Sequence, residues 1–360
     1  MLDVSISSPD CLRPGAALAP PANLGALCEA AGRTRDAAGI DGLFQTLACA
    51  LTHTVPFPGS GDTLARWRIL ADVARRSLPL AKLVEGHLDA LAILHELRCW
   101  SEVQPQDVWA TWCAEPPGMR VVATADDADG RHVRLSGIKP WCSGAAAATR
   151  ALVSVWNPRG EASLAAVHMD DAGVRISDRG WQAVGMGPTD SVDVEFRHAR
   201  AVLVGAPGAY VERPGFMHGA AGVAACWYGA AVALADALRS GVRRRPDDAH
   251  ALAHLGAVDV VLAQAGMQLR DCARAIDDAP HRPHACAVRR SRLAVEQAAL
   301  AVLERAPRAI GPAPFCKDAT LAGLLADLPV YLRQSHAERD LAAHGLALLD
   351  DSEGATPWTL

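Results

Sequence analysis

The sequence LSGIKPWCSGA occupies residues 135–145. A short apolar run, ALVSVW at residues 151–156, follows it closely. Together they indicate a strand, a turn that carries Trp141 and Ser143, and a second strand that leaves the turn. The segments before and after have helical patterns, so this stretch marks the β part of a chain ordered helices, strands, helices.

Working outward, apolar residues recur at three- and four-residue spacing on both sides of a strand-rich middle. The sequence predicts helices over 24–51, 64–76, 78–97, 219–241, 249–276, 285–305 and 320–349. It predicts further strands over 120–125, 132–135, 164–169, 173–176 and 191–196. The expected fold class is α+β: a helical domain over 1–112, an antiparallel β-barrel or sandwich over 113–205 and a four-helix bundle over 206–360.

Composition excludes several classes of protein. The chain has 360 residues and a formal net charge of −5, with no basic face, so we expect no nucleic-acid partner. Its ten cysteines show no ligand spacing, which argues against a metal site or a disulfide framework and favours the cytoplasm. The uncharged run 219–235 is rich in Ala and Gly and predicts a buried bundle helix, so no membrane span is expected.

Three motifs, in this order, resemble the acyl-CoA dehydrogenase superfamily of flavoproteins. Residues 112–116 read WCAEP, similar to the family's Thr-Glu-Pro segment, with Ala114 in place of Thr. Residues 135–144 resemble the Leu-x-Gly-x-Lys-x-Trp-Ile-Thr/Ser turn. Residues 180–191 with 194–196 are similar to the stretch before the last strand of the middle domain. The resemblance covers almost the whole chain and implies the family's three-part fold.

The resemblance implies an FAD site. Trp141 and Ser143 would lie against the flavin ring, with Ser143 near N5, and Cys142 belongs to the same turn. Ala114 and Glu115 would lie along the pyrimidine side of the ring. The remaining implied contacts are Gly311, toward the adenosine diphosphate of a neighbouring subunit, and the candidate substrate residues Thr189 and Ser191. From the turn alone, a core tryptophan and an ordinary turn serine remain an alternative.

The chain departs from the family where substrate and diphosphate are normally bound. The Gly-Ala-Gly-Ser-Asp loop that normally touches acyl-CoA is missing after residue 117, and Gly187 stands where the family has Arg. Leu252 replaces the arginine that holds the diphosphate, and Leu cannot pair with phosphate. We therefore expect the diphosphate end to be held differently.

Neither of the family's usual carboxylate bases is present. The two stand-ins are Asp327, between apolar residues that would raise its pKa, and His218 at the start of a helix. Each also fits an ordinary capping or surface role. The charged cluster 333–340 indicates either a solvated helix or the rim of a site.

The resemblance implies α,β-dehydrogenation of an acyl thioester such as acyl-CoA, with hydride transfer to N5 of FAD. Electrons would pass to an acceptor such as an electron-transferring flavoprotein, and the protein would be a cytoplasmic homodimer or homotetramer. Two alternatives stay open. A flavin-dependent monooxygenase of the same fold needs no carboxylate base, and a catalytically degenerate paralogue would serve as a partner subunit.

Overall fold

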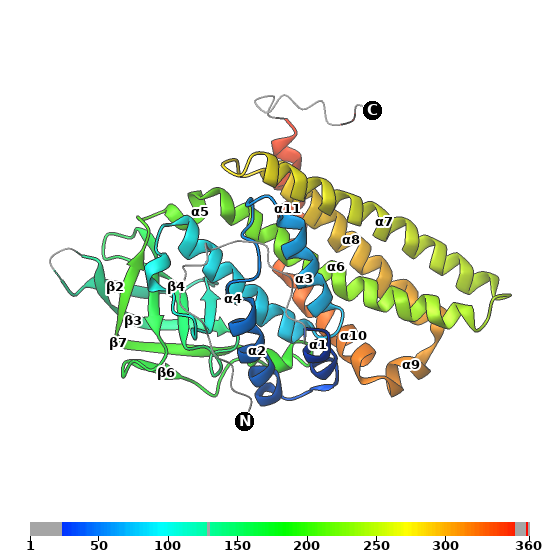
Figure 1. The fold of residues 1–360 in the computed structure, drawn as a ribbon, viewed down its shortest axis with the longest axis horizontal. Helices are drawn as coiled ribbons and strands as arrows, with labels where there is room; N and C mark the ends of the chain where they lie inside the picture. The colour runs from blue at the N-terminus through cyan, green and yellow to red at the C-terminus, as the bar shows by residue number, and fades with distance from the viewer. Residues whose placement is uncertain (1–23, 128–129, 350–357, 359–360) are drawn as a thin grey trace, which may run out of the picture.

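The strands and the long helices occupy opposite ends of the molecule. The computed structural model describes residues 24–127, 130–349 and 358. Figure 1 shows the strands gathered at one end, helices α6, α7 and α8 at the other, and the N-terminal helices between them. The predicted α+β fold, with helical ends and a central β region, is confirmed.

From residue 24 onward, the N-terminal part contains four helices, and two of them begin at a side-chain cap. They are α1 (Leu24–Arg33), α2 (Ala37–Leu51), α3 (Thr63–Ala74) and α4 (Leu78–Glu96). The predicted helix over 24–51 is divided in two because the Asp36 side chain accepts the Gly39 N–H and starts α2. Ser77 caps α4 in the same way through the Leu80 N–H. Helix α4 is buried along most of its length, including Glu85 and His87.

The described residues include seven strands, and five of them close into a barrel. The seven are β1 (Trp109–Trp112), β2 (Val121–Ala125), β3 (His132–Cys142), β4 (Arg150–Trp156), β5 (Ala162–His168), β6 (Val174–Ile176) and β7 (Val192–Val204). The order is β1-β4-β2-β3-β7-β5, with β6 on β7, and pairing of β4 with β5 closes β2, β3, β4, β5 and β7 into the barrel. Strand β1 is too short to show an alternating pattern, which is why the sequence does not predict it. Strands β3 and β4, which flank the Trp141 turn, do not pair with each other.

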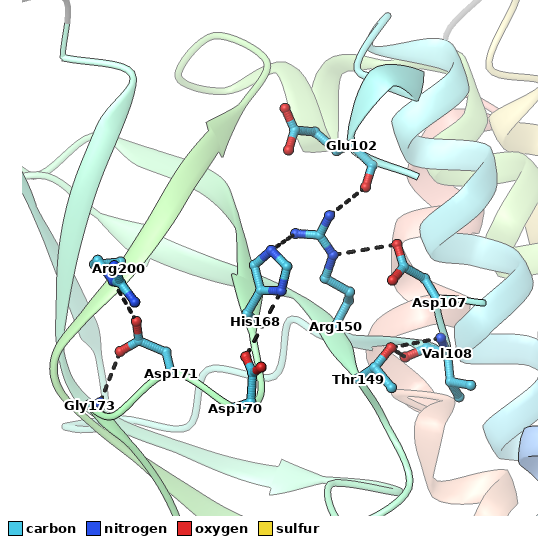
Figure 2. Close-up of polar contacts among 10 residues, drawn as sticks. All are labelled: Glu102, Asp107, Val108, Thr149, Arg150, His168, Asp170, Asp171, Gly173 and Arg200. Atoms are coloured by element: carbon cyan, nitrogen blue, oxygen red, sulfur yellow. Dashed lines mark hydrogen bonds and ion pairs between the residues drawn. The ribbon is translucent and has the colours of Figure 1, made fainter. Parts of the chain in front are cut away.

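A buried arginine fastens the segment before β1 to the barrel (Figure 2). Arg150 donates to the Glu102 carbonyl at 2.7 Å and to the Asp107 carboxylate at 3.4 Å, and it contacts the His168 ring nitrogen. The Val108 N–H donates to the Thr149 hydroxyl at 2.9 Å. Because these charged and polar groups satisfy one another, the entry to β1 is held firmly beside α4.

The C-terminal part is helical, as predicted, with two changes. Its helices are α5 (Ala209–Glu212), α6 (Pro214–Arg243), α7 (Ala249–Asp278), α8 (Ala285–Ile310), α9 (Pro312–Lys317), α10 (Ala319–Tyr331) and α11 (Glu338–Ala347). Helix α8 continues past its predicted end at residue 305, through Pro307, and ends at Ile310. The predicted helix over 320–349 is interrupted at 332–337, and this interruption faces the cavity described below.

Two of these helices, α6 and α7, are long and apolar enough to cross a membrane by length and composition. The most apolar window of α6 is 61% buried inside the protein and that of α7 is 28% buried. Helix α6 packs on α3, α4, α8 and α10, as expected for the predicted buried bundle helix. Helix α7 keeps an exposed apolar face that includes Leu252, Val260 and Met267.

Candidate functional site

A cavity of about 940 Å³ lies where the barrel meets the helices. This volume is near the upper end of the range of about 300–1,000 Å³ that ligand pockets occupy. The cavity is lined by the end of β1, the turn after β3, the loop that follows β6, and residues of α4, α5, α6, α8 and the break between α10 and α11. Of the residues predicted from the sequence, Ala114, Trp141, Ser143, Thr189 and Ser191 line it together.

Trp141 stands on the cavity wall in a strained backbone conformation. Its φ is 57°, in the left-handed region that bulky residues rarely adopt, and its side chain is 52% exposed. The register between β3 and β7 shifts between Lys139 and Cys142, so a β-bulge turns the indole out of the sheet. A core tryptophan would be buried, so the core interpretation of Trp141 does not hold. The indole supplies a large flat apolar surface to the cavity.

Three hydroxyl groups form a hydrogen-bonded chain beside Trp141. The Ser143 and Ser191 hydroxyl oxygens are 2.7 Å apart, and those of Ser191 and Thr189 are 2.9 Å apart. The Thr189 hydroxyl donates to the Met186 carbonyl at 2.7 Å. Because a hydroxyl has one proton, Thr189 must accept from Ser191, and Ser191 must accept from Ser143. The chain therefore leaves Ser143 with free lone pairs and no free proton.

The turn that presents Ser143 is fixed from both sides. The Trp112 indole N–H donates to the Ser143 carbonyl at 3.1 Å, and the Gly144 N–H donates to the Thr189 carbonyl at 2.8 Å. Gly144 has φ of 66°, and a Cβ there would lie 2.9 Å from a methyl of Leu83 on α4. Glycine at this position lets the turn approach α4 closely.

The motif residues Glu115, Lys139 and Cys142 lie in or beside the turn and do not line the cavity. Glu115 accepts from the Ser154 hydroxyl at 2.6 Å and from the Trp156 indole at 2.9 Å. The fully buried Lys139 donates to Ser154 at 2.7 Å and to the Ala114 carbonyl at 3.3 Å. Cys142 is buried, and burial raises the pKa of its thiol well above the ordinary value.

Neither residue considered as a base faces the cavity. Asp327, buried in α10, accepts the Met186 N–H at 2.5 Å and holds the loop before β7 against this helix. His218 donates from Nε2 to the Arg282 carbonyl at 2.9 Å, and burial lowers its pKa. Gly311 lies between α8 and α9, outside the cavity lining of this chain.

The pH dependence of stability provides a test of the role of Asp327. Burial raises the pKa of Asp327 to about 6 from its ordinary 3.8. This group therefore stabilises the fold most below about pH 4, and that contribution is lost as the pH rises through about 6, a change of about 3 kcal/mol. We expect Asp327→Asn, which keeps an oxygen for the Met186 N–H, to be more stable than the wild type at about pH 8. Urea unfolding at about pH 4 and pH 8 measures this, and a less stable variant at pH 8 would contradict it.

Sequence reasoning missed the charged floor of the cavity. Lys82, Glu85 and Asp89 project from α4, and Tyr210 and Arg213 come from the start of the bundle. The Lys82 ammonium and the Glu85 carboxylate are 2.7 Å apart. The sequence feature that could have identified this floor is the spacing of three and four between charged residues along a helix otherwise rich in Leu and Ala. The cluster 333–340 does form part of the rim, through Arg333, Gln334, His336 and Asp340.

Among the described residues, no group of three or more His, Cys, Asp or Glu side chains is placed to hold a metal ion. The cavity instead offers an aromatic wall, a hydroxyl chain and paired charges. This set of groups suits an organic ligand with a flat apolar part and a few polar atoms.

No protein-family model matches the sequence, and no curated protein matches it. Solved structures define its class: the chain has the acyl-CoA dehydrogenase-like fold. It is similar to TdsC from Paenibacillus sp. A11-2 in its FMN-bound form, with TM-score 0.75, 17% identity and coverage of 91% of this chain and 96% of that one.

Two further structures are about equally similar. Methanesulfinate monooxygenase MsuC from Pseudomonas fluorescens gives TM-score 0.74 at 17% identity, over 95% of this chain and 99% of that chain. KijD3, in complex with FMN and a dTDP-linked amino-keto sugar, gives TM-score 0.73 at 20% identity, over 92% and 93%. The likeness spans nearly the full length of both chains in each comparison.

Proposed function

We propose that this protein is a flavin-dependent monooxygenase that binds reduced FMN in the cavity. This choice favours the monooxygenase alternative over acyl-thioester dehydrogenation, and FMN over FAD. Proteins of the same fold include the dibenzothiophene monooxygenase TdsC, which binds FMN, and the methanesulfinate monooxygenase MsuC. The diphosphate arginine of FAD-binding relatives is replaced by Leu252, and FMN has no diphosphate to hold.

The residues present fit a flavin ring. Trp141 offers an exposed aromatic face, and Ser143 lies two residues away on the same turn. When bound, a reduced flavin supplies the electrons that activate oxygen. The protein's part is to position the ring, exclude water and present hydrogen-bonding groups of the right polarity.

The observation that carries the proposal is the direction of the hydroxyl chain. Because Ser143 donates toward Ser191, its free lone pairs can only accept a hydrogen bond from a ligand. Reduced flavin has a hydrogen on N5 and oxidised flavin does not. Ser143 would therefore accept from N5–H of the reduced form, which makes the site selective for that form.

Anaerobic titration with reduced FMN, and aerobic titration with oxidised FMN, test this selectivity. We expect the wild type to bind reduced FMN more tightly than oxidised FMN. Ser143→Ala should lower the affinity for reduced FMN by about tenfold, which corresponds to the loss of one hydrogen bond. Ser191→Ala frees the Ser143 proton and should reduce the preference for the reduced form.

Trp141→Ala serves as the matched control for the titration. It removes the aromatic wall and should weaken both forms of FMN equally, with little change in stability because the indole is half exposed. Equal affinity of the wild type for the two forms, or no effect of Ser143→Ala, would contradict the proposed direction of the chain.

We also propose that the protein is a homo-oligomer, a dimer or tetramer. The support is the apolar outer face of α7, where Leu252, Val260 and Met267 are 46%, 53% and 55% exposed. We expect light scattering to give a molar mass that is a multiple of 37.8 kDa, and Val260→Glu to lower it. A monomeric wild type would contradict this part of the proposal.

A further inference from the structure

The floor of the cavity carries charged side chains from α4 where an acyl chain would require an apolar surface. Glu85 is 8% exposed and is paired with Lys82. One turn further along α4, Asp89 also lines the cavity, with a side chain 18% exposed. Burying an alkyl chain against an ionised carboxylate would cost free energy, so this floor disfavours acyl-CoA.

Asp89 differs from Glu85 in having no hydrogen-bond donor of its own. Its nearest cation is Arg213, whose Nη2 lies 3.8 Å from Asp89 Oδ1, beyond hydrogen-bonding distance. Arg213 Nη1 instead pairs with Glu96 Oε2 at 2.7 Å, and Glu96 also accepts the Gly215 N–H. Arg66, on α3, donates to the Pro56 carbonyl and does not line the cavity. In the part of the chain that the structure describes, the Asp89 oxygens are therefore left to a ligand.

Helix α6 is shaped to leave room for this carboxylate. A Cβ at Gly219 would lie 2.8 Å from Asp89 Oδ1. Tyr210 and Phe216, packed edge to face with centroids 5.3 Å apart, line the same cavity. A carboxylate beside aromatic rings is a setting that binds a protonated amine, through a charge-assisted hydrogen bond and the ring faces.

We propose that Asp89 is a specificity-determining residue that binds a primary amine of the substrate at the floor of the cavity. This inference rests on the proposed function, because it identifies the substrate class of the same site. Arg213 and Lys82, which also line the cavity, each have a carboxylate closer than Asp89, Glu96 and Glu85 respectively, both at 2.7 Å. Burial raises the pKa of Asp89, as expected for a carboxyl that lacks donors until a ligand binds.

Calorimetric titration with three probes of equal chain length tests the inference: n-hexylamine, hexan-1-ol and hexanoate. We expect the full-length protein, with and without FMN, to bind hexylamine at least tenfold more tightly than hexanol, and hexanoate more weakly still. Asp89→Asn should abolish the preference for the amine. Asp72→Asn is the matched control, because this exposed carboxylate on α3 does not line the cavity; it should leave hexylamine binding unchanged.

Gly219→Ala provides a second variant in case Asp89→Asn fails to fold. The added methyl group would push the Asp89 carboxylate aside. We therefore expect Gly219→Ala to lower the affinity for hexylamine about tenfold while FMN still binds. Equal binding of hexylamine and hexanol by the wild type, or an unchanged preference in Asp89→Asn, would overturn the inference. Because FMN binding is measured separately, its loss would contradict the proposed function and not the role of Asp89.

Discussion

Replacing Gly185 by alanine should detach the loop before β7 from α10 and destabilise the protein by about 3 kcal/mol or more. A Cβ at Gly185 would lie 2.0 Å from the Ala326 carbonyl oxygen and 2.8 Å from a methyl of Val330. The helix backbone cannot move aside, so the loop must move. The next residue, Met186, would then lose its hydrogen bond to Asp327.

The same change should weaken FMN binding by tenfold or more, because the loop carries Thr189 and Ser191 into the cavity. Urea unfolding and FMN titration measure the two effects. Gly187→Ala is the matched control, since a Cβ there meets no atom within 4 Å, and it should change stability by less than about 0.5 kcal/mol. If Gly185→Ala were as stable as this control, the loop would not pack on α10 as described.

Removal of the Lys139 charge should have the second largest effect. Lys139→Met leaves Glu115 and Ser154 without their buried donor and should lower the free energy of unfolding by about 2–4 kcal/mol. The cost is smaller than for a fully buried pair because the Glu115 side chain is 26% exposed. Burial lowers the pKa of Lys139, and the nearby Glu115 carboxylate opposes this effect.

A double-mutant cycle with Glu115→Gln separates the ion pair from simple packing. We expect the double variant to lose less free energy of unfolding than the sum of the two single variants, by about 1 kcal/mol or more. Glu115→Gln removes the carboxylate charge that Lys139→Met leaves unpaired. Strictly additive effects, measured by urea unfolding, would show that Lys139 does not act through Glu115.

The local motifs predicted several residues that meet at one cavity. Trp141, Ser143, Thr189 and Ser191 come from segments about 50 residues apart in sequence, and the closed barrel brings them to one cavity. Their order along the chain was enough to identify the fold. The hydrogen-bond direction of the hydroxyl chain was not predictable, because it depends on the Met186 carbonyl in a loop with left-handed residues.

The charged residues of α4 that line the cavity were not predicted, for a different physical reason. In sequence, Lys82, Glu85 and Asp89 look like the solvated face of an amphipathic helix. They are enclosed because α6 packs on α4, and its glycines at 215 and 219 leave room for the acidic side chains. That contact joins residues more than a hundred positions apart. In the same way, the sequence does not show that Asp327 accepts the Met186 N–H, because that contact depends on how α10 packs against the loop.

The most direct test of the account is the anaerobic absorption spectrum of the FMN-loaded protein during addition of a panel of acyl-CoAs. If the protein is a monooxygenase, no acyl-CoA should bleach the oxidised flavin. Admitting oxygen to the protein loaded with reduced FMN should restore the oxidised spectrum. Bleaching by any acyl-CoA under anaerobic conditions would contradict the account and restore the dehydrogenase interpretation.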